Sequence, residues 1–373
     1  MKPLDSWMYP PTTSTAESPP SSDTCSSVGA RLGNLLASVH CDSKLMYKSQ
    51  ALTADGKLWF ENPENKDIVR DQIVGSILPI QRPRVTPDMG KVEEMVGTIL
   101  QDVEGSFLPN LCPSLSPPCV PELMFSIGDL RTGSILVGSP HTTSDSNSNT
   151  NLNGAEVEVA LIDWEFASPA RIGQDIAQLS AWLYLFATSS SWSSIGPHYR
   201  RVGVDTIAIS SAPDADPGQF GSDFGDGVNS GPGVEGGAES VTGEMLGRST
   251  AGSLLNALLE AYARKVEEHS DYASLVDEDY DKGRYRKERL ATVRSIWISF
   301  GKEVIYVAIE ADCRFSRFFT VGVEEEAKVW QRAMIEIGSW YVLKAGKSPD
   351  EEFEEVVRKE DVLRRMYTVS ESL

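Results

Sequence analysis

Three acidic residues stand just after short apolar stretches, where predicted strands open into loops. Asp129 follows the stretch 123–127 after one glycine. Asp163 and Glu165 follow the stretch 157–162. Loops at strand ends present carboxylates without burying them unpaired, and residues two apart in an extended segment point to the same side. Asp163 and Glu165 could therefore grip one hard cation through oxygen ligands, with Asp129 acting as a base beside it.

These acids also have interpretations that involve no metal or phosphate. A lone Asp after a strand, such as Asp129, is often a turn or cap residue. Asp163 and Glu165 could form a solvated strand end, or a carboxylate pair like that of a glycosidase. The choice depends on the residues that surround the acids in the chain.

The elements that must position these acids are mostly helical. Apolar residues such as Val28, Leu32 and Leu36 recur at helical spacing and predict amphipathic helices. The predicted helices span 28–40, 67–78, 88–101, 174–186, 254–268, 287–314 and 324–343. Apolar and β-branched runs predict strands at 123–127, 134–137 and 157–162. The sequence therefore predicts an α+β chain whose few strands cluster around the acids.

Three segments have too few apolar residues to form part of a hydrophobic core. Residues 1–27 are rich in Pro, Ser and Thr and predict a disordered leader. Residues 138–154 (Ser, Asn and Thr) and 211–242 (Gly and Asp) predict disordered inserts, the first as a swollen hairpin loop. The rest divides into a body, 28–345, and an acidic C-terminal helix and tail, 346–373.

The composition argues against several classes of function. The chain of 373 residues carries 34 Lys plus Arg against 54 Asp plus Glu, and this formal charge of −20 disfavours nucleic acid as a partner. At 40% apolar and 24% charged residues the chain lies near the globular average. The near-apolar run 176–187 is shorter than the roughly 20 residues that cross a bilayer, so no membrane span is predicted. Five scattered cysteines do not make a disulfide framework, which favours a reducing, cytoplasmic location.

Three motifs, in order along the chain, carry a resemblance to a known family. They are Ile127-Gly128-Asp129-Leu130-Arg131-Thr132-Gly133-Ser134, Ala160-Leu161-Ile162-Asp163-Trp164-Glu165-Phe166 and Gly173-Gln174-Asp175-Ile176-Ala177. Their order and spacing resemble the catalytic core of the aminoglycoside phosphotransferase and choline kinase superfamily, which shares the protein-kinase-like fold. The Thr-Gly-Ser and the Asp-x-Glu are most similar to methylthioribose kinase and to fungal hydroxytryptamine kinases. The similarity covers about residues 28 to 345.

The resemblance implies a role for each acid. Asp129 would be the catalytic Asp that orients or deprotonates the acceptor hydroxyl, and Asp163 would hold Mg²⁺ on the phosphates of ATP. Glu165 would be the second acid of the pair at the metal. Ser134 stands where many members place a metal-binding Asn, so its hydroxyl would contact the metal and the nucleotide. Asp175 would steady the catalytic loop.

The chain departs from the family in two places. Ile127 replaces the His that the family places two residues before the catalytic Asp, which removes a polar brace of the loop. Only 27 residues of low complexity precede the helix at Val28, where such kinases have a β-rich lobe that holds ATP. The expected fold is therefore a protein-kinase-like C-lobe, mostly helical with a small β-hairpin region, whose N-terminal ATP-binding lobe is absent or truncated.

Two functions from different classes follow. The first is an ATP-dependent phosphotransferase that moves the γ-phosphate of Mg·ATP to a hydroxyl of a small molecule; the negative charge favours a cationic amine or an uncharged sugar alcohol as acceptor. The second is a catalytically inactive, kinase-like binding module or kinase remnant, in which a protein partner covers the surface of the missing lobe. Neither function predicts contact with nucleic acid or with a membrane.

Overall fold

The computed structural model describes the chain in ten stretches. They are residues 1–9, 19–50, 89–107, 123–138, 157–171, 173–190, 249–274, 282–310, 324–360 and 362–364. The predicted helix over 67–78, the insert at 211–242 and all but the first residue of the insert at 138–154 lie outside the described residues.

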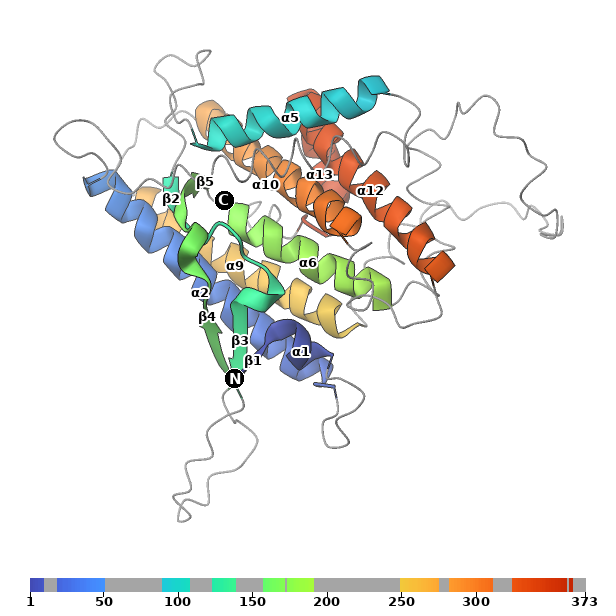
Figure 1. Cartoon of the computed structure of the whole chain (residues 1–373). Helices are drawn as coiled ribbons and strands as arrows, with labels where there is room; N and C mark the ends of the chain where they lie inside the picture. The colour runs from blue at the N-terminus through green and yellow to red at the C-terminus, as the bar shows by residue number, and fades with distance from the viewer. Residues whose placement is uncertain are drawn as a thin grey trace, which may run out of the picture.

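The described residues form a mostly helical body with small antiparallel sheets at one side (Figure 1). The helices are α1 (Leu4–Met8), α2 (Ser22–Gln50), α5 (Met89–Phe107), α6 (Gln174–Ser190), α9 (Thr250–Ser274), α10 (Lys282–Glu310), α12 (Glu324–Lys347) and α13 (Asp350–Lys359). α6 lies between α9 and α10, α2 runs along α9, and α12 packs against α10 and α5. The helices predicted within the described stretches are confirmed, and most run past their predicted ends because tertiary packing stabilises turns without clear periodicity. None of the described helices is long and apolar enough to cross a membrane.

α6 is the central helix of the body. Every residue from Asp175 to Ser189 is buried, as expected for a helix that is apolar all round. Its aromatic residues Trp182, Tyr184 and Phe186 belong to the core. Because α6 is enclosed by other helices, Asp175 in its first turn has a fixed place in the body.

Two pairs of helices cross closely at glycines. A Cβ at Gly29 or Gly33 of α2 would lie 2.3 or 2.4 Å from a backbone oxygen of α9. α10 and α12 meet in the same way, with Gly301 against the backbone of Gly338. No larger residue fits at these crossings unless a helix moves, so the glycines set the spacing of the helices.

A hairpin forms the larger of the two sheets. β3 (Ile135–Gly138) pairs antiparallel with β4 (Glu158–Leu161), which confirms the predicted strand pair on either side of the first insert. β1 (Lys2–Pro3) adds to the other edge of β3. The hairpin therefore holds the residues before β3 close to the residues after β4.

The second sheet contains a strand that sequence reasoning missed. β2 (Leu123–Ser126) was expected, but its antiparallel partner is β5 (Ser168–Arg171). The sequence Ser-Pro-Ala-Arg has little β propensity. Its proline is tolerated because β5 lies at the edge of a two-stranded sheet.

The first nine residues pack against the body, which corrects the prediction of a disordered leader over 1–27. Leu4 and Met8 of α1 are fully buried. The Tyr9 ring stacks on Phe186 of α6, with ring centroids 5.6 Å apart. α2 also begins earlier than predicted, within the supposed leader. The Pro- and Ser-rich composition conceals a few large apolar side chains, and their burial offsets the entropy of ordering this short segment.

The C-terminal helix shares the core of the body. Phe353 of α13 is fully buried, and its ring lies 5.1 Å from that of Trp297 in α10. The Arg294 guanidinium lies 4.3 Å from the centre of the Phe353 ring. Val362 and Leu363 are buried in the same apolar cluster. Residue 345 is therefore not a boundary between core and tail in the described part of the chain.

Candidate functional site

Two turns of the chain carry the candidate acids. After β2, Gly128 adopts a φ of 85° and leads into Asp129, and a single 3₁₀ turn at Thr132–Ser134 then enters β3. We call residues 127–134 the Asp129 turn. After β4, the chain forms a second 3₁₀ turn at Trp164–Phe166. We call residues 162–166 the Asp163 turn; it lies beside the Asp129 turn because β3 and β4 are paired.

Asp163 has an uncommon backbone conformation. Its φ of 71° and ψ of 52° lie in the left-handed region, and it is the one residue other than glycine with a positive φ in the described stretches. Asp and Asn tolerate this region better than other residues because their short polar side chains bond locally. Such conformations cluster at functional sites, where the surroundings hold them in place.

The two turns bring Asp129 and Asp163 to the same place. Arg131 lies between them, with Nε 3.4 Å from Asp129 Oδ2 and Nη2 3.5 Å from Asp163 Oδ2. The Ser134 hydroxyl lies 3.4 Å from the same Asp163 oxygen and 3.2 Å from the backbone oxygen of Asp129. The side chains of Asp129 and Asp163 are 36% and 28% exposed, so both carboxylates are accessible to a ligand.

Glu165 lies in a 3₁₀ turn and not in an extended segment. The predicted grip of Asp163 and Glu165 on one cation assumed an extended segment, and that assumption is wrong. β4 ends at Leu161, and the left-handed Asp163 turns the chain into the 3₁₀ turn that contains Glu165, which is exposed. No group of three or more His, Cys, Asp and Glu side chains is arranged to hold a metal within the described stretches.

The buried side chain of Asp175 holds the Asp129 turn through hydrogen bonds to its backbone. Its carboxylate is fully buried and accepts hydrogen bonds from Ser126 Oγ (2.7 Å), the Ile127 N–H (2.8 Å) and the Gly128 N–H (3.1 Å). His40 Nε2 of α2 lies 3.1 Å from the same carboxylate. Burial by itself raises the pKa of Asp175, but the hydrogen bonds from His40 and from the turn lower it below its ordinary value. This agrees with the steadying role that the family resemblance implies.

The brace continues into a helix that sequence reasoning did not connect to the site. Tyr262 of α9 places its hydroxyl 2.8 Å from His40 Nδ1, and both side chains are buried. Because an ionised carboxylate can only accept, His40 Nε2 donates to Asp175, and Nδ1 shares a hydrogen bond with the Tyr262 hydroxyl. Burial raises the pKa of Tyr262 well above its ordinary value, so this hydroxyl stays protonated. The residues stand far apart in sequence, and only the close crossing of α2 and α9 unites them.

Gln178 is a second brace that sequence reasoning missed. Its Nε2 donates to the Gly128 carbonyl at 3.0 Å, and its Oε1 lies 3.4 Å from the Leu130 N–H. The available signal was its place one turn after Asp175 in an otherwise apolar helix. Ile127 is fully buried in the core. Asp175 and Gln178 therefore hold the turn through its backbone, and Ile127 anchors it by packing.

Asp163 and the fully buried Ser134 are the residues of the two turns that could hold a small divalent cation through oxygen atoms. Mg²⁺ prefers oxygen ligands, keeps several waters, and is commonly held by one or two carboxylates together with the phosphates of a nucleotide. A carboxylate and a hydroxyl that lie 3.4 Å apart on neighbouring turns supply ligands of this kind. Asp129 stands on the other side of Arg131, where it would face a substrate bound next to such a cation.

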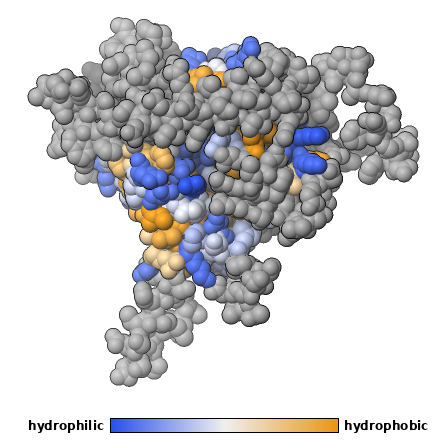
Figure 2. All heavy atoms as spheres, in the orientation of Figure 1, coloured by the Kyte–Doolittle hydropathy of each residue, from blue (hydrophilic) through white to orange (hydrophobic). Residues whose placement is uncertain are grey.

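Apolar side chains surround the two turns on the surface. Figure 2 shows hydrophobic residues gathered over the β3–β4 hairpin, next to hydrophilic ones. Ile162 and Trp164 in the Asp163 turn are 39% and 41% exposed, and Met1, 61% exposed, lies beside Gly138 at the other end of the hairpin. The Trp164 ring stacks on Phe125 at 5.8 Å. This surface could be covered by a ligand or by a partner.

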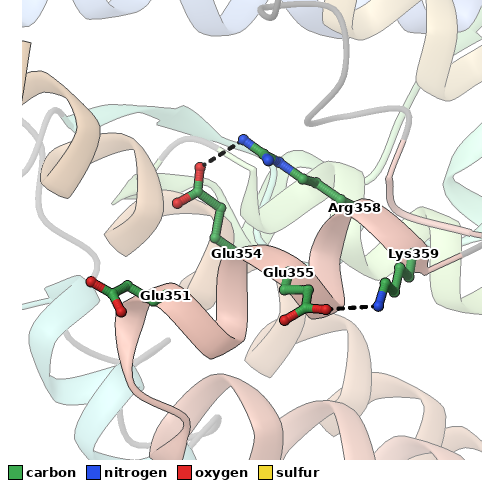
Figure 3. Close-up of a pocket in the computed structure, with 5 residues that line it drawn as sticks. All are labelled: Glu351, Glu354, Glu355, Arg358 and Lys359. Atoms are coloured by element: carbon green, nitrogen blue, oxygen red, sulfur yellow. Dashed lines mark hydrogen bonds and ion pairs between the residues drawn. The ribbon is translucent and has the colours of Figure 1, made fainter.

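A cavity of about 400 Å³ lies elsewhere, along α13 (Figure 3). Glu351, Glu354, Glu355, Arg358 and Lys359 line it. Glu354 pairs with Arg358 at 3.1 Å and Glu355 with Lys359 at 2.7 Å, so the charges are matched one turn apart along a single helix. Such pairs are common on exposed helix surfaces and give no sign of chemistry.

Comparisons with known proteins identify no family for the chain. No family model matches it, and a search of curated proteins finds no similar sequence. The features of the chain that bear on its function are therefore Asp129, Asp163 and the residues that hold their turns.

Proposed function

We propose that this chain is an ATP-dependent phosphotransferase that acts on a hydroxyl of a small molecule. Asp129 orients the acceptor hydroxyl and takes its proton, and Asp163 holds the cation that accompanies the nucleotide. Ser134 assists Asp163 through its hydroxyl. Phosphoryl transfer asks a protein mainly to position two substrates and to neutralise charge, so two carboxylates on rigid turns are the residue types it requires.

The observation that carries this proposal is the meeting of Asp129 and Asp163 across Arg131. Both carboxylates lie within 3.5 Å of the guanidinium, although they stand on different turns. Both are accessible, while the backbone that carries Asp129 is held by the buried Asp175. A rigid support under exposed acids is what a positioning site needs, whereas a solvated strand end needs no such support.

The parts of the reaction divide among these residues by their chemistry. When bound, Mg²⁺ would offset the negative charge of the phosphates, a function that no carboxylate can supply. Asp163 and Ser134 would hold it through oxygen atoms, and Asp129 would accept the proton of the acceptor hydroxyl. A cationic amine or an uncharged sugar alcohol fits a chain of charge −20 better than an anionic acceptor does.

A transfer assay with matched variants tests this proposal. ADP release from Mg·ATP is measured against a panel of amino alcohols and sugars, with Asp163→Asn as the site variant. Asn keeps the left-handed backbone, so this variant is expected to fold and to lose transfer. Asp42→Asn is the control, because Asp42 is 74% exposed on α2 and should tolerate the same change. Equal transfer by Asp163→Asn and the wild type would contradict the role of Asp163.

A non-catalytic binding module is the second candidate, and the exposed apolar side chains favour it. Ile162 and Trp164 lie in the Asp163 turn, where a protein partner could cover them. In this alternative Arg131 permanently neutralises the two acids, and the site binds no nucleotide. Binding of Mg·ATP that depends on Asp163 distinguishes the first candidate from the second.

A further inference from the structure

Arg131 already occupies the position of a cation between the two acids. Its Nε and Nη2 point at Asp129 Oδ2 and Asp163 Oδ2, at 3.4 and 3.5 Å. Its own side chain is 37% exposed, so it can swing away from both carboxylates. A guanidinium does not lose its charge in a protein, which means that this cation can leave only by moving.

We propose that Arg131 is a built-in competitor for the divalent cation: it occupies the carboxylates of Asp129 and Asp163 until the metal displaces it. The proposal rests on the proposed function, because it assigns the metal to Asp163. The oxygen that contacts Arg131 is also the Asp163 oxygen that faces the Ser134 hydroxyl. A metal bound between Asp163 and Ser134 would meet the guanidinium at short range, and the two like charges repel each other.

This competition makes metal binding depend on the nucleotide. When the metal displaces Arg131 into water, the guanidinium loses its ion pairs with Asp129 and Asp163. This loss costs free energy, so the metal alone is expected to bind weakly. The oxygens of a triphosphate offer Arg131 new acceptors of matching geometry, so the metal and the triphosphate together are expected to bind well. Such coupling is reciprocal: the triphosphate tightens the metal by the same factor as the metal tightens the triphosphate.

Manganese binding to the nucleotide-free chain tests the competition directly. The fraction of free Mn²⁺ is measured by electron paramagnetic resonance for the wild type and for Arg131→Met. A half-exposed ion pair changes an equilibrium constant by up to about fivefold. Arg131→Met removes the pairs with Asp129 and Asp163 and also the positive charge that repels the metal. We therefore expect Mn²⁺ to bind on the order of tenfold more tightly to this variant. Arg131→Gln is measured alongside as a second uncharged variant, and thermal unfolding verifies that each variant is folded.

Three controls assign the effect to this position. Arg131→Lys keeps the charge and should bind Mn²⁺ more like the wild type than like Arg131→Met. Arg264→Met removes the same charge from an exposed place on α9 and should leave Mn²⁺ binding unchanged. The double variant Arg131→Met with Asp163→Asn should lose the gain, which separates this site from other binding to a chain of charge −20.

The second measurement is the ratio of Mn²⁺ dissociation constants without and with ATP. The wild type should show a large ratio of these two constants. Arg131→Met should show a ratio closer to one, because no guanidinium competes with Mn²⁺ for the carboxylates in this variant. The inference is overturned if the uncharged variants bind Mn²⁺ no more tightly than the wild type, or if the gain survives Asp163→Asn. A wild type that neither binds nor uses Mg·ATP contradicts the proposed function, yet a gain that depends on Asp163 would still support the competition.

Discussion

Asp163 adopts a backbone conformation that costs free energy, and its neighbours nevertheless hold it there. The cost is small for Asp or Asn and larger for residues whose side chains cannot bond locally. Ser134 and Arg131 both reach its carboxylate from the facing turn. Asn is therefore the substitution that removes the charge with least disturbance to the backbone, whereas Ala would change charge and conformation together.

The buried Asp175 should matter to stability as much as to the site. Asp175→Asn places an amide NH₂ group opposite donors such as the Ile127 and Gly128 N–H groups, which then lack a charged acceptor. We expect a loss of roughly 2–4 kcal/mol in the free energy of unfolding, measured with urea. Asp42→Asn, on the exposed face of α2, should change the same quantity by less than about 0.5 kcal/mol. Equal effects of the two variants would contradict the brace.

The lowered pKa of Asp175 also predicts how stability depends on pH. Because folding lowers this pKa, the unfolded chain binds more protons in the interval between the two values. The stabilisation from Asp175 is present in full above the unfolded value of about 3.9 and is lost as the pH falls through the folded value. Urea unfolding at a series of pH values should show the difference between wild type and Asp175→Asn shrinking in this acid range. A difference that grows on acidification would have the wrong sign.

At the scale of elements, the close crossing of α2 and α9 brings His40 and Tyr262 together under the site. Gly33→Ala would place a methyl group 2.4 Å from the Leu258 backbone oxygen, which cannot yield as a side chain does. We expect a loss of about 1–3 kcal/mol in the free energy of unfolding. Gly97→Ala on α5 is the matched control, because its methyl group meets no atom within 4 Å. The higher helix propensity of Ala should raise the free energy of unfolding of this variant by about 0.5–1 kcal/mol. Chemical denaturation of both variants should therefore give changes of opposite sign.

Local pattern predicted most of the described elements, and it failed where long-range contacts decide the structure. α12 shows helical periodicity over its own residues, and α6 is a near-apolar run too long for an ordinary strand, so both were predictable. β5 exists because β2 needs a partner, and its own residues carry no strand signal. The Asp163 turn was predicted as an extension of β4, since no sequence signal distinguishes a left-handed Asp from an extended one.

At the scale of the whole molecule, one apolar core joins the two ends of the described chain. Leu4 and Met8 of α1, and Phe353 of α13, are fully buried in the same cluster as α6. Leu4→Ala and Met8→Ala should each lower the free energy of unfolding by about 2–5 kcal/mol in urea denaturation. Ser6→Ala, on the exposed side of α1, should be nearly neutral. Small effects of both substitutions would instead support the prediction that residues 1–27 contribute nothing to the stability of the fold.

Part of the candidate site could be predicted from residue types and their order, and the part that depends on tertiary contacts could not. Asp129, Asp163 and Ser134 were found because their types and order in the chain carry the signal. The positions of Arg131, Gln178 and Tyr262 were not predicted, because their roles depend on which turns and helices meet. The 3₁₀ turn that contains Glu165 was not predicted either, because the spacing of Asp163 and Glu165 suggested an extended segment.

Calorimetric titration of the purified chain with Mg·ATP, together with Asp163→Asn and Asp42→Asn, tests the central claim most directly. The site assignment predicts micromolar binding by the wild type and by Asp42→Asn, with the heat lost in Asp163→Asn. No binding by the wild type at millimolar nucleotide, or equal binding by Asp163→Asn, would contradict it.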